Sequence, residues 1–167
     1  MKWLKDKSET NYELKHNDEV LLKMHFDYAM KGTKATCQSI SESFTIEQEN
    51  IWTTNTIIKE NEVIIARTST DKWYSSLSTL EVKGQKIKFR IRNNPLAEII
   101  FFTKNEDDCI LSCGLKVSKK SMTETVLSFG EALIQNPIKH YLLAICWYIF
   151  KPIAEDNASS DTLVILV

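Results

Sequence analysis

Between residues 12 and 117, short apolar runs alternate with polar residues and are separated by polar turns. In residues 20–26, apolar side chains fall two positions apart: Val20, Leu22, Met24 and Phe26. A period of two is typical of strands that have one buried and one exposed face. Segments such as Glu60-Asn61 and Lys83-Gly84-Gln85 have the composition of hairpin turns. The pattern predicts about nine or ten short antiparallel strands in this part of the chain.

The pattern changes after Val117. Ser121 and Glu124 have the spacing of a capping box, in which the two side chains satisfy the first free amides of a helix. Apolar residues then follow with helical spacing: Val126, Leu127, Phe129, Leu133 and Ile134. We therefore expect an amphipathic helix from about Met122 to Gln135.

The segment from Tyr141 to Phe150, YLLAICWYIF, is a continuous apolar and aromatic run. As a helix it is hydrophobic on every side, so it must be covered all round. It would reach about 15 Å, half of a bilayer core of about 30 Å, and is too short to span a membrane. We predict a helix from about Ile138 to Phe150, ended by Pro152 and enclosed by β-structure. A hairpin that dips into a membrane is the alternative, supported by the basic residues at its ends: Lys139, His140 and Lys151.

These elements together predict a mainly β fold, an antiparallel barrel of about 9–12 strands that encloses the near-C-terminal helix. A closed barrel has no free edge, and its interior must be filled. The final segment Thr162–Val167 is apolar and would promote aggregation if exposed, so we expect it to pair into the sheet as a last strand. A chain of 167 residues is suited to a single domain over residues 1–167.

Charge and cysteine content indicate which partners and which cellular compartment to expect. The 21 basic and 22 acidic residues give a net charge of -1, so no general attraction to nucleic acid is expected. The four cysteines, Cys37, Cys109, Cys113 and Cys146, lack zinc or thioredoxin spacing and are expected to be buried free thiols. The N-terminus lacks the apolar core of a signal peptide. We expect a cytoplasmic protein, or a soluble module that contacts the inner face of the membrane peripherally.

The strongest candidate for a binding site is a row of alternating basic residues, the basic strand: Lys86, Lys88, Arg90 and Arg92. Their charges should project from one face, about 7 Å apart. No acidic residue lies between Val82 and Ala97. Like charges in a row are tolerated when neighbours or a ligand compensate them. The functional interpretation is an anionic ligand such as a lipid phosphate. The alternative is an exposed strand paired with the acidic segment near Glu42–Glu49.

A second basic cluster precedes the first predicted helix: Lys116, Lys119 and Lys120. We include Lys119 and Lys120 among the candidate ligand-binding residues, although a flexible loop with solvent-exposed charges is the favoured interpretation, because the capping box already occupies the amides of the helix start. No catalytic residue, metal site or cofactor is predicted, because nucleophile-elbow and glycine-rich phosphate motifs are missing from the sequence. The three histidines have no metal-ligand spacing: His16, His25 and His140. We therefore expect a protein that is not an enzyme.

Many short strands followed by the apolar helix Tyr141–Phe150 resemble the tubby C-terminal-domain group. The closer likeness is to its small LURP-one-related and phospholipid-scramblase-like members. The segment Asn94–Ile99, which opens a late strand, is also similar to that group. The resemblance implies a closed barrel around a central hydrophobic helix. In that group tubby binds phosphoinositides through lysine and arginine side chains on its barrel surface, so the resemblance also implies a basic lipid-binding face.

The leading functional prediction is a non-enzymatic module that binds anionic membrane lipid headgroups through the basic strand. Two alternatives stay open. One is an interaction or scaffold domain whose partner is another protein, and the other is a small carrier that holds an apolar ligand in its interior. The sequence predicts neither a nucleic-acid partner nor a transmembrane span.

Overall fold

The computed structural model describes residues 1–6, 10–29, 32–50, 53–70, 76–93, 96–117 and 123–157. Within these residues one antiparallel sheet of 12 strands is built as a meander, each strand pairing with the next along the chain. The strands are β1 (Lys2–Lys5), β2 (Asn11–His16), β3 (Glu19–Ala29), β4 (Gly32–Gln38), β5 (Ser43–Gln48), β6 (Thr56–Glu60), β7 (Val63–Thr70), β8 (Leu77–Val82), β9 (Gln85–Asn93), β10 (Ala97–Phe102), β11 (Cys109–Val117) and β12 (Thr123–Phe129). The predicted mainly β, antiparallel class is confirmed.

Tight turns set the register of several hairpins. Asn61 and Glu62 join β6 to β7, and Lys83 and Gly84 join β8 to β9, with positive φ at all four residues. Two consecutive residues with positive φ match the right-handed twist of the flanking strands. The predicted turn at Lys83-Gly84 is therefore confirmed, and the turn near Glu60-Asn61 lies one residue later than expected.

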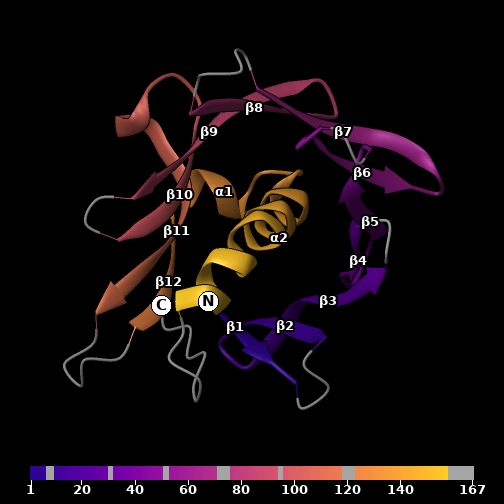
Figure 1. The fold of residues 1–167 in the computed structure, drawn as a ribbon, viewed down its shortest axis with the longest axis horizontal. Coiled ribbons are helices and arrows are strands. Elements are labelled where there is room, and N and C mark those ends of the chain that lie inside the picture. The colour runs from indigo at the N-terminus through magenta and orange to yellow at the C-terminus, as the bar shows by residue number, and fades with distance from the viewer. Residues whose placement is uncertain are drawn as a thin grey trace.

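The helix α2 (Lys139–Asn157) lies in the hollow of the curved sheet (Figure 1). Its side chains from 141 to 148 are all buried, which confirms a helix that is covered on every side. They join the inward-facing residues of the strands in one hydrophobic core. At its centre the rings of Trp3 on β1 and Trp147 on α2 stack, with centroids 5.5 Å apart.

The helix is longer than its sequence predicts. It continues through Pro152 to Asn157 and does not end near Phe150. Proline removes one backbone donor and so leaves the carbonyl of residue 148 without its helical partner. Side-chain contacts on both sides of the proline, made by Lys151 before it and Glu155 after it, hold the last turns against β1–β3. Tertiary contacts thus override the local stop signal.

The amphipathic helix expected from Met122 to Gln135 is wrong. Among the described residues of this segment, Thr123–Phe129 form β12, paired with β11, and the helical part is α1 (Glu131–Ile134). Along β12, Thr125 and Leu127 are buried while Ser128 is exposed, which is the alternation of a strand. The spacing of apolar residues in this segment is compatible with a helix or a strand. Strand β11 is available to accept and donate the backbone hydrogen bonds of the segment, and this pairing favours the strand.

The sheet was predicted to close into a barrel. The structure supports an antiparallel sheet that packs against a helix, without the predicted closure among the described residues. Within the described residues the ladders run from β1 to β12 and do not include a pair between these two strands. The structure therefore shows a curved sheet around a helix. The predicted last strand, Thr162–Val167, lies outside the described residues. No helix in the described part of the chain has the length and apolar character needed to cross a membrane.

The cysteines differ from expectation at one position. Cys37, Cys113 and Cys146 are buried, whereas Cys109 is exposed. A register shift in the β10–β11 ladder pairs Cys109 with Phe102, while Cys113 pairs with the inward-facing Ile99. The extra residue of this bulge moves Cys109 to the outer face of the sheet.

Candidate anion-binding face

The basic strand is β9, and its four charges lie on the outer face of the sheet. Ile87 and Phe89, between them, are buried against the interior. The alternation deduced from the sequence thus places Lys86, Lys88, Arg90 and Arg92 in one row. Their surroundings, however, divide the row into two halves.

The arginine half is neutralised by carboxylates from two directions. Arg92 donates to Glu98 at 2.6 Å and to Glu106 at 3.0 Å, and Arg90 lies 2.8 Å from Glu106. The hydrogen bond to Glu98 is the main reason that the pKa of Arg92 is raised. Glu98 comes from the neighbouring strand β10, and Glu106 from the 3-10 turn η1 (Glu106–Asp108) that follows it. The two arginines are engaged within the fold.

Apolar residues of β10 lie beside the basic row on the same outer face. Ile100 and Phe102 project from the outer face of β10, where the register places them opposite Arg90 and Lys88, and both are buried. The methylene stems of long basic side chains can cover such residues while their charged ends stay at the surface. Arg90 therefore combines a charge pair with packing, which is a structural role.

The lysine half is more accessible. Lys86 lies 3.7 Å from Glu81, and the two side chains are 71% and 58% exposed. An exposed ion pair of this kind is worth little, about 0–1 kcal/mol. No ion pair involves Lys88 within the part of the chain that the structure describes. Two neighbouring ammonium groups on the outer face are thus weakly compensated.

The prediction that the basic strand pairs with the acidic segment near Glu42–Glu49 is wrong. The segment near Glu42–Glu49 forms β5 and its flanks, and the three strands β6, β7 and β8 separate it from β9 in the sheet. Its carboxylates pair elsewhere: Glu47 with Lys34 and Lys59, and Glu49 with Arg67. Sequence reasoning missed Glu81, Glu98 and Glu106 as the partners, because only the hairpins bring them beside β9. Lys119 and Lys120 lie outside the described residues, and Lys116 is exposed on β11.

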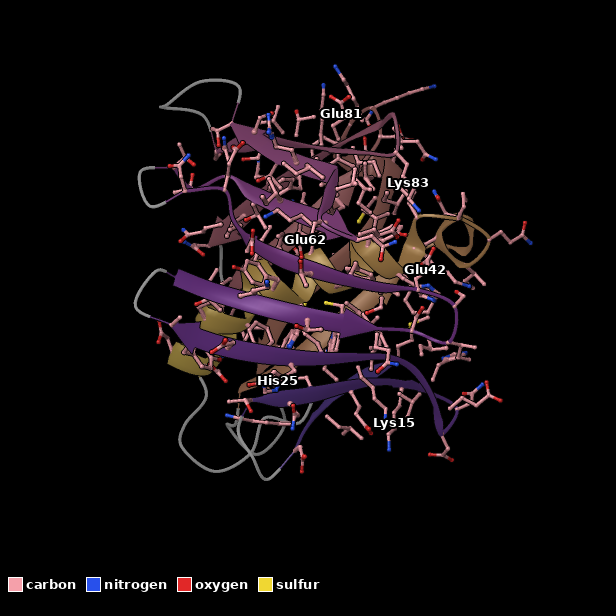
Figure 2. The ribbon with its side chains drawn as sticks, turned by 90° about the vertical axis from the view of Figure 1, so that its right-hand side faces the viewer. Lys15, His25, Glu42, Glu62, Glu81 and Lys83 are labelled. Atoms are coloured by element: carbon pink, nitrogen blue, oxygen red, sulfur yellow. The ribbon has the colours of Figure 1, made fainter. Side chains whose placement is uncertain are left out.

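A second polar cluster lies at the start of α2, and the sequence carried no signal for it. Lys83 donates to the hydroxyl of Tyr141 at 2.7 Å, and that hydroxyl donates to Glu60. Beside them His140 lies 3.2 Å from Glu42. Figure 2 shows Glu42 and Lys83 near the same end of the strands. Burial, followed by the carboxylates, raises the pKa of Tyr141 well above its usual value. The cluster ties two turns and a strand end to the helix, so it serves as an anchor.

Replacing Glu106 by alanine should lower the free energy of unfolding by about 1 kcal/mol, because two arginines lose a shared partner over a covered apolar patch. Urea denaturation of the purified protein would measure the change. Asp107→Ala is the matched control, since its carboxylate takes part in no ion pair among the described residues. Equal losses in the two variants would contradict the structural role of Glu106.

The described residues contain no group of three or more side chains that could hold a metal ion. The chain matches no protein-family model, no curated protein sequence and no solved structure. The geometry of the described residues is therefore the basis for the proposals that follow.

Proposed function

We propose that this protein is a non-enzymatic binding module that binds anionic membrane lipid headgroups through the outer face of β9. The observation that carries the proposal is the pair of exposed lysines, Lys86 and Lys88, whose charges are only weakly compensated. Arg90 and Arg92 belong to the same row, but their guanidinium groups are already paired with glutamates.

The expected interaction is electrostatic and shallow. A basic residue near an anionic membrane surface contributes about 1 kcal/mol, and salt screens this attraction within about 10 Å. Two lysines alone give weak binding to single vesicles, so attachment is expected to depend strongly on the density of anionic lipid. In this proposal the protein is peripheral to the membrane.

Fold analogy supports the proposal without carrying it. A curved antiparallel sheet around a C-terminal helix is compatible with the tubby-like arrangement. We propose that the sheet closes into a barrel of that type. Fold alone does not determine function, so the two lysines carry the proposal.

The two alternative functions, an apolar-ligand carrier and a protein-interaction domain, make different demands on the structure. An apolar ligand would need interior space, and α2 occupies the hollow of the sheet with buried side chains. That arrangement argues against a carrier. A protein partner with an acidic surface would use the same lysines, and it is distinguished from a lipid by the experiment below.

The test is sedimentation with vesicles of phosphatidylcholine, with and without phosphatidylserine or a phosphoinositide, at low and moderate salt. The wild type should bind only the anionic vesicles, and less at the higher salt. Lys86→Glu/Lys88→Glu should weaken binding by at least about tenfold, because two attractions of about 1 kcal/mol each become repulsions.

The matched control is Lys15→Glu/Lys34→Glu, which changes the net charge equally on β2 and β4 and should leave binding within about twofold. Lack of binding by folded wild-type protein would refute the lipid proposal and favour an acidic protein partner. Equal loss in both double variants would show that net charge matters and the β9 face does not.

A further inference from the structure

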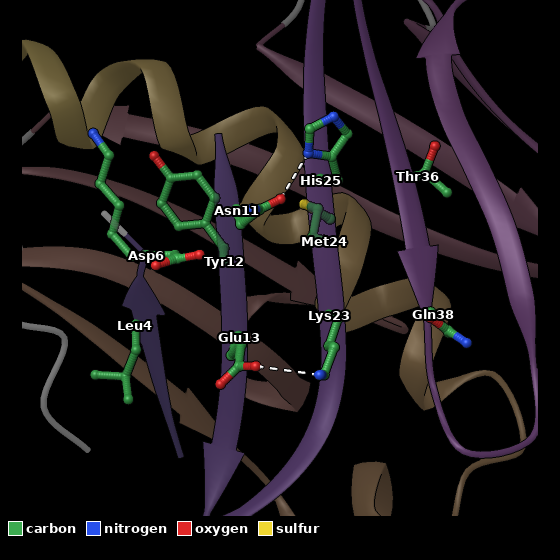
Figure 3. Close-up of a pocket in the computed structure, with 11 residues that line it drawn as sticks. Leu4, Asp6, Asn11, Tyr12, Glu13, Lys23, Met24, His25, Thr36 and Gln38 are labelled. Carbon is green, nitrogen blue, oxygen red and sulfur yellow. Dashed lines mark hydrogen bonds and ion pairs between the residues drawn. The ribbon is translucent and has the colours of Figure 1, made fainter. Parts of the chain in front are cut away.

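The outer face of β1–β4, on a different part of the sheet from β9, contains a cavity of about 680 Å³ (Figure 3). Eight of its eleven lining residues are polar: Lys5, Asp6, Asn11, Glu13, Lys23, His25, Thr36 and Gln38. Small-molecule sites have volumes of roughly 300–1,000 Å³, so the cavity has the size of a ligand site.

The floor of the cavity consists of two parallel rows that cross three strands. The register of β2, β3 and β4 places Asn11, His25 and Thr36 side by side. The second row, two residues along each strand, is Glu13, Lys23 and Gln38. Strand spacing makes this floor about 10 Å across and about 7 Å along the strands, similar to a monosaccharide or disaccharide.

The two rows leave hydrogen-bonding groups available to a ligand. Nδ1 of His25 lies 2.7 Å from Oδ1 of Asn11, so it is the protonated nitrogen and Nε2 is left as an acceptor in the neutral ring. Within the described residues the side chains of Thr36 and Gln38 make no hydrogen bond. Together with Nε2 they offer one hydroxyl, one amide and one acceptor.

The charged groups of the lining are balanced and already engaged. Two lysines face two carboxylates, so the net charge is zero. Lys5 lies 3.3 Å from Glu155, and Lys23 lies 3.4 Å from Glu13. An anion or cation entering the cavity would have to displace one of these pairs, whereas an uncharged ligand would not.

We propose that this cavity binds a small, uncharged polyhydroxylated ligand, namely a monosaccharide or disaccharide. A ligand hydroxyl donates to Nε2 of His25, another accepts from the amide of Gln38, and Thr36 can donate or accept. Leu4 on β1 gives the lining an apolar side that suits the C–H face of a sugar ring (Figure 3). This site is independent of the lipid-binding proposal for β9.

The test is a titration of the ¹⁵N-labelled full chain with glucose, galactose, mannose and maltose, followed by backbone amide chemical shifts. At least one sugar should shift amides around Asn11, His25 and Thr36 in a saturable manner. Thr36→Val/Gln38→Leu should weaken this binding by about tenfold, because two hydrogen bonds are lost. Thr79→Val/Gln85→Leu makes the same two changes on β8 and β9 and should leave it unchanged.

Three results would overturn the proposal. One is that no sugar shifts any of these amides in the folded protein. Another is that the shifts persist unchanged in Thr36→Val/Gln38→Leu, whose amide spectrum also reports whether it is folded. The third is that glycine or inorganic phosphate shifts these amides and the sugars do not, which would show a charged ligand.

Discussion

Trp147→Ala is expected to lower the free energy of unfolding by about 3–5 kcal/mol. Trp147 is fully buried at the centre of α2. It stacks on Trp3 at 5.5 Å and meets the ring of Tyr12 edge-on at 5.5 Å. Alanine would leave a large cavity where the helix meets β1 and β2, and the surrounding rings can collapse into it only in part.

Urea denaturation with fluorescence detection would measure this loss. Trp147→Phe should cost less than half as much, because it keeps a ring and removes an indole N–H that has no hydrogen-bond partner among the described residues. Ile40→Ala is the surface control, since Ile40 is 94% exposed and should change stability by less than about 0.5 kcal/mol. If Trp147→Ala cost no more than Ile40→Ala, α2 would not be the centre of the core.

Glu155→Ala is expected to lower the free energy of unfolding by about 3 kcal/mol. Lys151 is only 4% exposed, and its ammonium group donates to Glu155. The same carboxylate accepts a hydrogen bond from Tyr12 at 2.6 Å. Removing it leaves a buried positive charge over the faces of aromatic rings such as Phe26, 4.9 Å away, which compensate it less than a carboxylate does.

Thermal and urea denaturation of three variants would test this expectation. Asp156→Ala removes an exposed carboxylate one residue further on and should have almost no effect. Lys151→Met/Glu155→Ala should recover much of the loss, because the buried charge is removed together with its partner. A double variant no more stable than Glu155→Ala would show that the unpaired ammonium group is not the cause.

The pH dependence of stability gives an independent check on the same carboxylate. Burial raises the pKa of Glu155, but hydrogen bonds from Lys151 and Tyr12 outweigh burial and hold the pKa below its ordinary value of 4.5. A carboxyl group whose pKa is lower in the folded state stabilises the protein at pH values above its ordinary pKa. This contribution should disappear as the pH falls through the lower, folded-state pKa, and Glu155→Ala should lack that part of the acid dependence.

Sequence reasoning succeeded where a local pattern has one physical meaning. The alternation around Ile87 and Phe89 placed the basic residues on the outer face, because a strand directs successive side chains to opposite sides. The continuous run from Tyr141 needed cover on every side, and the hollow of the sheet provides it. It failed at Met122–Gln135, where apolar spacing alone was compatible with both a helix and a strand.

The candidate site illustrates the same division. The basic residues of β9 were identified from their order, but their partners Glu81, Glu98 and Glu106 were not. The rows that form the floor of the cavity on β2–β4 depend on register, which the turns and the buried face determine.

For this protein the sequence by itself determined which segments are strands over most of the chain, which helix is buried, and which basic residues share a face. Those features follow from the period of apolar side chains and from the need to remove them from water. Only the tertiary structure decided that α2 continues past Pro152, that Lys151 is buried with Glu155, and that glutamates neutralise Arg90 and Arg92. Each of these depends on groups distant in sequence, whose proximity arises from strand pairing and packing.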